Sequence, residues 1–167
     1  DGSQAGGTPL MKESGGTTNA TINSVNIGKG VNSVAGNTVL GELALDAAVT
    51  GGDNTAIGNL ALSALTSGTG NTAVGKATLD QNTTGSNNVA IGQGSLGTNS
   101  TASNNTAVGR FSLNANTTGA NNTAVGSGAL NSNTTGASNT AVGLNALASN
   151  TTGQQSVAVG LGALGSV

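Results

Sequence analysis

Few residues in this chain can perform acid–base or nucleophilic chemistry, and their spacing does not bring them together. Histidine and cysteine are absent, so neither a serine–histidine nor a cysteine–histidine pair can be built. Of the carboxylates, only Glu42 and Asp46 are close in sequence, and we interpret that pair as part of a charged outer face. All six lie in the first half of the chain: Asp1, Glu13, Glu42, Asp46, Asp53 and Asp80. The sequence therefore predicts no catalytic residues and a function other than that of an enzyme.

Metal and cofactor sites are not expected either. A calcium-binding repeat needs an aspartate in each unit, and aspartate is missing from the regular units of this chain. The Gly-Lys-Gly run at Gly28, Lys29 and Gly30 lacks the spacing of a phosphate-binding loop. We predict no bound metal and no cofactor.

Composition also excludes two classes of partner. The net charge is −2, Phe111 is the only aromatic residue, and Arg110 is the only charged side chain after Asp80. Nucleic-acid binding needs a basic stripe or aromatic stacking platforms, and the chain offers neither. No apolar run approaches the roughly 18 residues that a membrane-spanning helix requires, so no membrane span is predicted.

A repeat organises most of the chain. An Ala-Val-Gly triplet or a close variant returns every 17 residues, and we call its glycine the marker glycine: Gly41, Gly58, Gly75, Gly92, Gly109, Gly126, Gly143 and Gly160. The residue before each marker glycine is Val, Ile or Leu, and the fourth residue after it is always Leu. A fixed period of this kind is typical of a protein that stacks one structural unit on the next.

Each unit has the composition of short strands and tight turns. The Asn-Thr-Ala-Val segment alternates with a period of two, so Thr and Val share one face and Ala takes the other. The density of Gly, Asn and Thr disfavours helix. We therefore predict an all-β fold, a β-solenoid of 17-residue coils. Its predicted structural core consists of Val74, Leu79, Ile91, Leu96, Val108, Leu113, Val125, Leu130, Val142 and Leu147.

Two polar features of the repeat allow a structural and a functional interpretation. Asparagines recur four residues before and seven residues after the marker glycine, and stacked asparagines are expected to hydrogen-bond along the coils. A sugar-binding strip is the alternative. Paired threonines form a candidate surface array for ice or glycan: Thr83, Thr84, Thr117, Thr118, Thr134, Thr135, Thr151 and Thr152.

The chain divides into two parts. Residues 1–23 are glycine-rich and unpatterned, and we expect an extended N-terminal arm or linker there. The solenoid region covers residues 24–167, with an irregular first turn at 24–36 before the 17-residue repeats begin. An atypical first unit is what a stacked repeat needs as a cap.

The repeat also predicts self-association. Each coil has only two positions that are always aliphatic. The free energy gained by burying these two side chains is small compared with the conformational entropy lost when 17 residues become ordered. Packing the apolar edges of several copies together would increase that burial, so we expect an obligate homo-oligomer, with three chains as the natural closed arrangement. An end-to-end filament is a variant, in which the N-terminal arm would pair with a neighbouring protomer.

The units resemble two families of fibrous proteins. The pattern at 122–136 and 139–153 is similar to repeats of phage and prophage tail fibres. The runs Asn88–Gly92 and Ser156–Gly160 resemble the Ser-Val-Ala-Ile-Gly core of the head repeats of trimeric autotransporter adhesins, although the 17-residue unit is longer. The resemblance implies a left-handed β-roll in an intertwined or side-by-side homotrimer.

It further implies an attachment protein located outside the cell, on a cell surface or on a virion. The favoured function is therefore a non-enzymatic fibre segment or adhesin head whose partners are copies of itself and a receptor or glycan. The alternative is a repetitive solenoid that binds ice or glycan.

Overall fold

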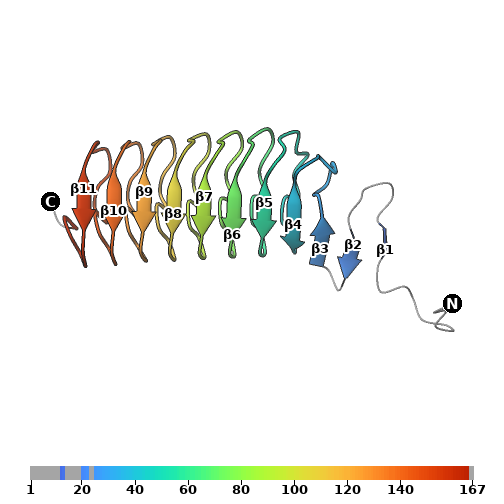
Figure 1. Cartoon of the computed structure of the whole chain (residues 1–167), viewed down its shortest axis with the longest axis horizontal. Coiled ribbons are helices and arrows are strands. Elements are labelled where there is room, and N and C mark those ends of the chain that lie inside the picture. The colour runs from blue at the N-terminus through green and yellow to red at the C-terminus, as the bar shows by residue number, and fades with distance from the viewer. Residues whose placement is uncertain (1–11, 14–19, 23–24, 166–167) are drawn as a thin grey trace.

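The computed structural model describes residues 12–13, 20–22 and 25–165 of the chain. Within these ranges the chain forms one β-solenoid of about seven turns, with coils of about 17 residues. Figure 1 shows the coils side by side in a rod, with one strand of each coil on the same side. The all-β fold and the 17-residue coil predicted from the repeat are confirmed.

The strands of successive coils form one continuous sheet. They are β4 (Thr38–Gly41), β5 (Thr55–Ile57), β6 (Thr72–Val74), β7 (Val89–Ile91), β8 (Thr106–Val108), β9 (Thr123–Val125), β10 (Thr140–Val142) and β11 (Val157–Val159). Neighbours pair in parallel with no slip, so that Ala90 lies beside Ala73 on one side and Ala107 on the other. Each coil therefore places chemically equivalent residues directly above one another.

The centre of each strand points into the coil. Val39 in β4 and the alanine at the same position of every later coil are buried: Ala56, Ala73, Ala90, Ala107, Ala124, Ala141 and Ala158. The leucine four residues after the marker glycine packs into the same cluster and is fully buried from Leu45 to Leu130. Because the coil is narrow, a small residue faces a large one across it, and the two fill the interior together.

The prediction of the core is therefore half right. Leu79, Leu96, Leu113, Leu130 and Leu147 are core residues, as expected. Placing the aliphatic residue that precedes the marker glycine in the core of the chain was wrong, because it shares the outer face of the strand with threonine. Exposed fractions of 40% at Ile91, 37% at Val125 and 36% at Val142 show this. Val74 and Val108 are half-buried and lie outside the core cluster.

The bend after each strand requires glycine. The marker glycines have φ between +122° and +158°, and a Cβ at Gly109 would lie 2.6 Å from the carbonyl carbon and oxygen of Gly126 in the next coil. The inward leucine that follows has positive φ in every coil, for example 48° at Leu113, where its amide donates to the carbonyl of Ala129. A positive φ is unfavourable for leucine. Burial of the side chain and backbone hydrogen bonds to the next coil stabilise this conformation.

The N-terminal strands pair antiparallel, unlike the parallel strands of the coils. The strands β1 (Lys12–Glu13), β2 (Ala20–Ile22) and β3 (Val25–Gly28) form an antiparallel series that ends on β4. The irregular turn expected at 24–36 thus begins with a strand antiparallel to β4. Part of the expected arm, at 12–13 and 20–22, is paired in the sheet. The rest of that arm lies outside the described residues.

None of the described residues belongs to a helix that is long and apolar enough to cross a membrane.

Close stacking of the marker glycines can be tested with two alanine substitutions. Gly109 and Gly160 have similar φ, +137° and +126°, so the backbone strain of an added Cβ, on the order of 1–3 kcal/mol, should be similar in both. At Gly160 the nearest heavy atom to that Cβ is 4.0 Å away. We expect Gly109→Ala to lower the melting temperature, followed by circular dichroism, clearly more than Gly160→Ala. Equal losses would contradict the close approach.

Candidate functional site

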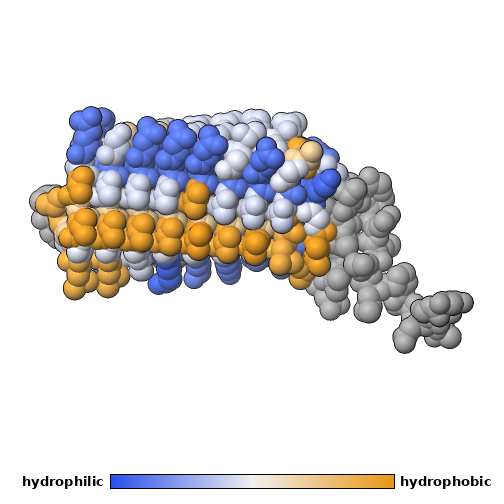
Figure 2. Space-filling model, in the orientation of Figure 1, coloured by the Kyte–Doolittle hydropathy of each residue, from blue (hydrophilic) through white to orange (hydrophobic). Residues whose placement is uncertain are grey.

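An aliphatic stripe runs along the outer face of the sheet from β4 to β11. It consists of the residue before each marker glycine: Leu40, Ile57, Val74, Ile91, Val108, Val125, Val142 and Val159. Each member is half-buried or exposed, and parallel pairing places each beside its equivalent in the next coil. In Figure 2 it is the band of hydrophobic colour that runs along the rod. An apolar band of this length is typical of an interaction surface.

The paired threonines do not act as a pair. The hydroxyl of the first threonine donates to a backbone carbonyl of the next coil, as from Thr83 to Ser100, Thr117 to Thr134 and Thr134 to Thr151. The second threonine is exposed at Thr84, Thr118, Thr135 and Thr152. Thr83, Thr117 and Thr134 of the predicted array therefore join coils, Thr151 is exposed in the last coil, and the second threonines form a single outward row.

That outward row is longer than the threonine pairs indicated. Counting nine residues from each marker glycine gives a hydroxyl row of exposed residues: Thr50, Ser67, Thr84, Thr101, Thr118, Thr135 and Thr152. Thr50, Ser67 and Thr101 fall outside the predicted array because none of them belongs to a Thr-Thr dipeptide. The distance from the marker glycine was the signal that would have found them.

The first asparagine column lies inside the rod. It comprises Asn37, Asn54, Asn71, Asn88, Asn105, Asn122 and Asn139, and all of them are buried. Each side-chain oxygen accepts from the backbone amide of the equivalent residue in the next coil, at 2.9 Å from Asn122 to Asn105 for example. Each side-chain amide donates to a turn carbonyl, as from Asn105 to Gly119 at 2.9 Å. The predicted hydrogen-bonded ladder is confirmed.

The second asparagine column, seven residues after the marker glycines, has a different set of hydrogen-bond partners. Asn82, Asn99, Asn116 and Asn133 are buried, and Asn150 is half-buried. From Asn99 onward, each side-chain amide donates to the side-chain oxygen one coil back, as from Asn116 to Asn99 at 2.9 Å, and to the carbonyl of its own turn. Burial of both columns rules out the alternative interpretation as a sugar-binding strip.

Ionisable groups do not gather into a reactive site. Among the residues that the structure describes, no group of three or more His, Cys, Asp or Glu side chains could hold a metal ion. Burial raises the pKa of Asp80, and backbone hydrogen bonds at Asp80 and Gln81 lower it to a smaller extent.

Comparison of the chain with protein-family models, with curated proteins and with solved structures finds no match.

The two asparagine columns should differ in their tolerance of leucine. In Asn105→Leu, the buried backbone amide of Asn122 loses its acceptor, which costs about 1–3 kcal/mol. In Asn116→Leu, the side-chain oxygen of Asn99 loses a donor, but no backbone group is left without a partner, since Gly119 still accepts from Asn105 and Asn133 still donates to Gly136. Leucine already fits at the equivalent position of an earlier coil, where Leu65 is fully buried. We expect urea unfolding to show a larger loss for Asn105→Leu, and the reverse order would contradict these roles.

Replacing Asp80 by asparagine should stabilise the fold at neutral pH. Because its pKa is raised in the folded chain, the carboxylate weighs against folding above that pKa, and this penalty fades as the pH falls and the group protonates. Asparagine fits the position, since the equivalent Asn114 donates to the carbonyl of Gly94. Thermal melts should show a higher melting temperature for Asp80→Asn at pH 7 and a smaller advantage near pH 4. A lower melting temperature at pH 7 would contradict this account.

Proposed function

We propose that this chain is a segment of a non-enzymatic attachment fibre that works as a homotrimer, with the aliphatic stripe of each copy facing a common axis. The observation that carries this proposal is the stripe itself. The eight parallel strands β4 to β11 place Val, Ile or Leu at the same outward position, and no charged residue occupies that position in any of them.

The partner that fits such a stripe along its whole length is another copy of the chain. Apolar side chains spaced by one coil, about 4.8 Å apart, interdigitate in register only with a surface of the same spacing. A second copy supplies that spacing at every coil. Three copies around one axis form a closed arrangement, and association would cover surface that water contacts in the single chain.

The remaining features of the proposal rest on the resemblance to tail-fibre and adhesin-head repeats. We propose a left-handed coil, a location outside the cell, on a cell surface or on a virion, and attachment to a receptor or glycan. The low number of ionisable groups and the rod shape support a structural role in preference to an enzymatic one. End-to-end assembly into a filament is the variant of this proposal.

Ice or glycan binding by a hydroxyl surface is the second candidate function. The unbroken hydroxyl row from Thr50 to Thr152 is the observation in its favour. A single file of hydroxyls matches a lattice in only one direction, so we rank this candidate below attachment. A thermal-hysteresis assay at high protein concentration tests ice binding, and the absence of activity would remove it.

Disrupting the aliphatic stripe should dissociate the trimer. Val125 is 37% exposed in the single chain, so Val125→Asp leaves the coil foldable but places a charge at the proposed axis, where three copies repel one another. Sedimentation at low micromolar concentration should show three chains for the parent protein and a smaller species for this variant.

A matched control places the same charge elsewhere on the rod. Thr118→Asp, in the exposed hydroxyl row, should leave the mass in solution unchanged. A parent protein that sediments as a folded monomer would overturn the proposal, and so would a trimer that Val125→Asp leaves intact.

A further inference from the structure

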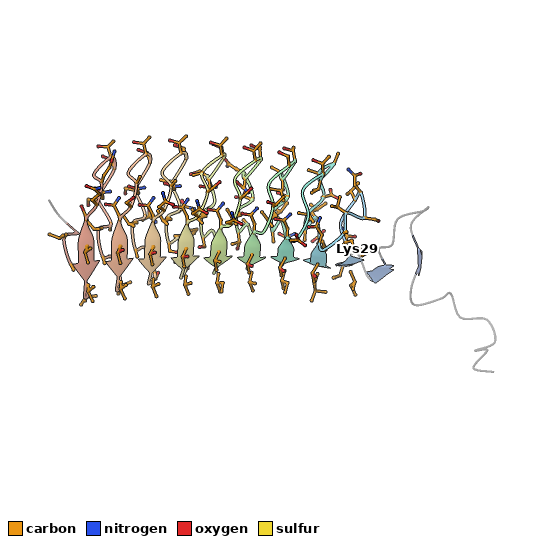
Figure 3. The ribbon with its side chains drawn as sticks, turned by 45° about the horizontal axis from the view of Figure 1, so that its top comes forward. Lys29 is labelled. Atoms are coloured by element: carbon orange, nitrogen blue, oxygen red, sulfur yellow. The ribbon has the colours of Figure 1, made fainter. Side chains whose placement is uncertain are left out.

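The residue directly after each marker glycine forms a variable column on the surface, in contrast to the uniform stripe beside it. Along the rod this column reads Glu42, Asn59, Lys76, Gln93, Arg110, Ser127, Leu144 and Leu161. All but the half-buried Asn59 are exposed. Figure 3 shows side chains projecting at regular intervals from the successive coils. The regular backbone thus presents a different side chain at each coil.

Three consecutive coils of this column carry cationic and amide groups. The amide of Gly94 donates to the carbonyl of Lys76 at 3.0 Å, and the amide of Phe111 donates to that of Gln93 at 2.9 Å. Lys76, Gln93 and Arg110 therefore lie one coil apart in register. Their order is cation, amide, cation, and the two charges come from positions about 10 Å apart, twice the strand spacing.

A specific contact holds the guanidinium of Arg110. Its Cζ lies 4.4 Å from the centroid of the Phe111 ring, within the range of a cation–π interaction. Phe111 is the only aromatic residue of the chain. Restricting the arginine before a ligand arrives lowers the entropy lost on binding.

The coil below makes room for that ring. A Cβ at Gly94 would lie 2.5 Å from two ring carbons of Phe111, so the ring packs directly over this glycine. At the same position, Gly128 and Gly162 are also glycines, other coils hold larger residues such as Leu60 and Asn145, and only the coil of Arg110 holds an aromatic ring. Phe111 and Arg110, packed over Gly94, thus form a local departure from the repeat that places one cation.

Two acidic side chains accompany these cations: Glu42 in the same column, and the half-buried Asp80, four residues after Lys76. Glu42 accepts a hydrogen bond from the side-chain amide of Asn59 at 3.3 Å, and Asn59 separates it along the column from Lys76. On the other side of Arg110 the column continues with Ser127, Leu144 and Leu161, which carry no charge. The positive charge of the described column is therefore confined to the coils of Lys76 and Arg110.

We infer that Lys76, Gln93 and Arg110 form a binding site for an acidic polysaccharide that lies along the rod. Arginine binds a carboxylate or sulfate with two parallel hydrogen bonds, lysine adds a point charge, and the amide of glutamine contacts the sugar between them. The separation of the charges suits acidic groups on alternate sugars of an extended chain. This inference rests on the proposed function, since a homotrimeric fibre would present three such sites and gain affinity through avidity.

The chemistry favours a polysaccharide over a nucleic acid. Two cations in a chain of net charge −2 cannot neutralise a run of phosphates. One face of the Phe111 ring meets Arg110 and the ring packs against Gly94, so the ring offers a base no open stacking platform.

Binding to hyaluronan oligosaccharides, which carry a carboxylate on alternate sugars, tests the site. The oligosaccharide is immobilised and the full chain is in solution. We expect Arg110→Ala to weaken binding at least tenfold and Lys76→Ala several-fold. Phe111→Leu keeps the charge and should still weaken binding several-fold, because the guanidinium loses its support. Should Phe111→Leu fail to fold, Arg110→Lys serves the same purpose, since lysine retains the charge and lacks the planar group.

The matched control is Lys29→Ala, which removes one positive charge at the exposed Lys29, labelled in Figure 3 at the N-terminal end of the rod. It should change binding less than twofold. Equal losses for Lys29→Ala and Arg110→Ala, equally tight binding of a DNA oligonucleotide, or no binding of hyaluronan at millimolar concentration would each overturn the inference. Sedimentation of the same samples separates the two proposals: an intact trimer that does not bind refutes only this site.

Discussion

Every coil of this protein depends on meeting its neighbour with the same hydrogen-bonding groups at the same height. The clearest case is the first asparagine column, whose side-chain oxygens accept from backbone amides one coil further on, from Asn54 to Ser156. An asparagine supplies both an acceptor and a donor in a small volume, so it satisfies a strand and a turn at once. Within the described residues, no buried side-chain nitrogen or oxygen lacks a partner.

This constraint explains why the interior contains so little hydrocarbon. The two asparagine columns occupy space that a larger core would fill with aliphatic side chains, and the strand contributes only alanine from its inner face in most coils. Apolar residues of greater size are displaced to the outer face, where Ile91 and Val125 remain more than a third exposed. The thin core of the coil and the apolar band on its surface are thus two results of one packing arrangement.

The sequence predicted the coil, its period and the inward leucines because a strict repeat constrains each of them directly. It also predicted that threonine and valine share a face of the strand. What it could not decide was which face points inward, since alternation is symmetric until the width of the coil is known. Ala73 and Val74 are both apolar, so either could have pointed inward. Because Leu79 fills most of the narrow interior, the smaller side chain, that of Ala73, is the one buried beside it. The antiparallel start at β3 was also missed, because Val25–Gly28 resembles the strands of the repeat but pairs in the opposite sense.

The surface was harder to predict than the interior. The threonine pairs were visible as dipeptides, yet whether each hydroxyl is satisfied within the rod depends on the carbonyl of the next coil. The support of Arg110 by Phe111, and of Phe111 by Gly94, joins residues from two coils, and composition alone does not indicate it. Such contacts depend on three-dimensional stacking, which the period implies but does not describe atom by atom.

Because the strands pair in register, the length of this rod can change only by whole coils. Removing one residue inside a coil would break the register between that coil and its neighbours, whereas removing 17 would join two coils whose partners are chemically equivalent. Stability in such an array is a sum over units and their contacts with nearest neighbours. A gene encoding this fold can therefore lengthen or shorten its product by recombination between repeats, and each whole step preserves the cross-section.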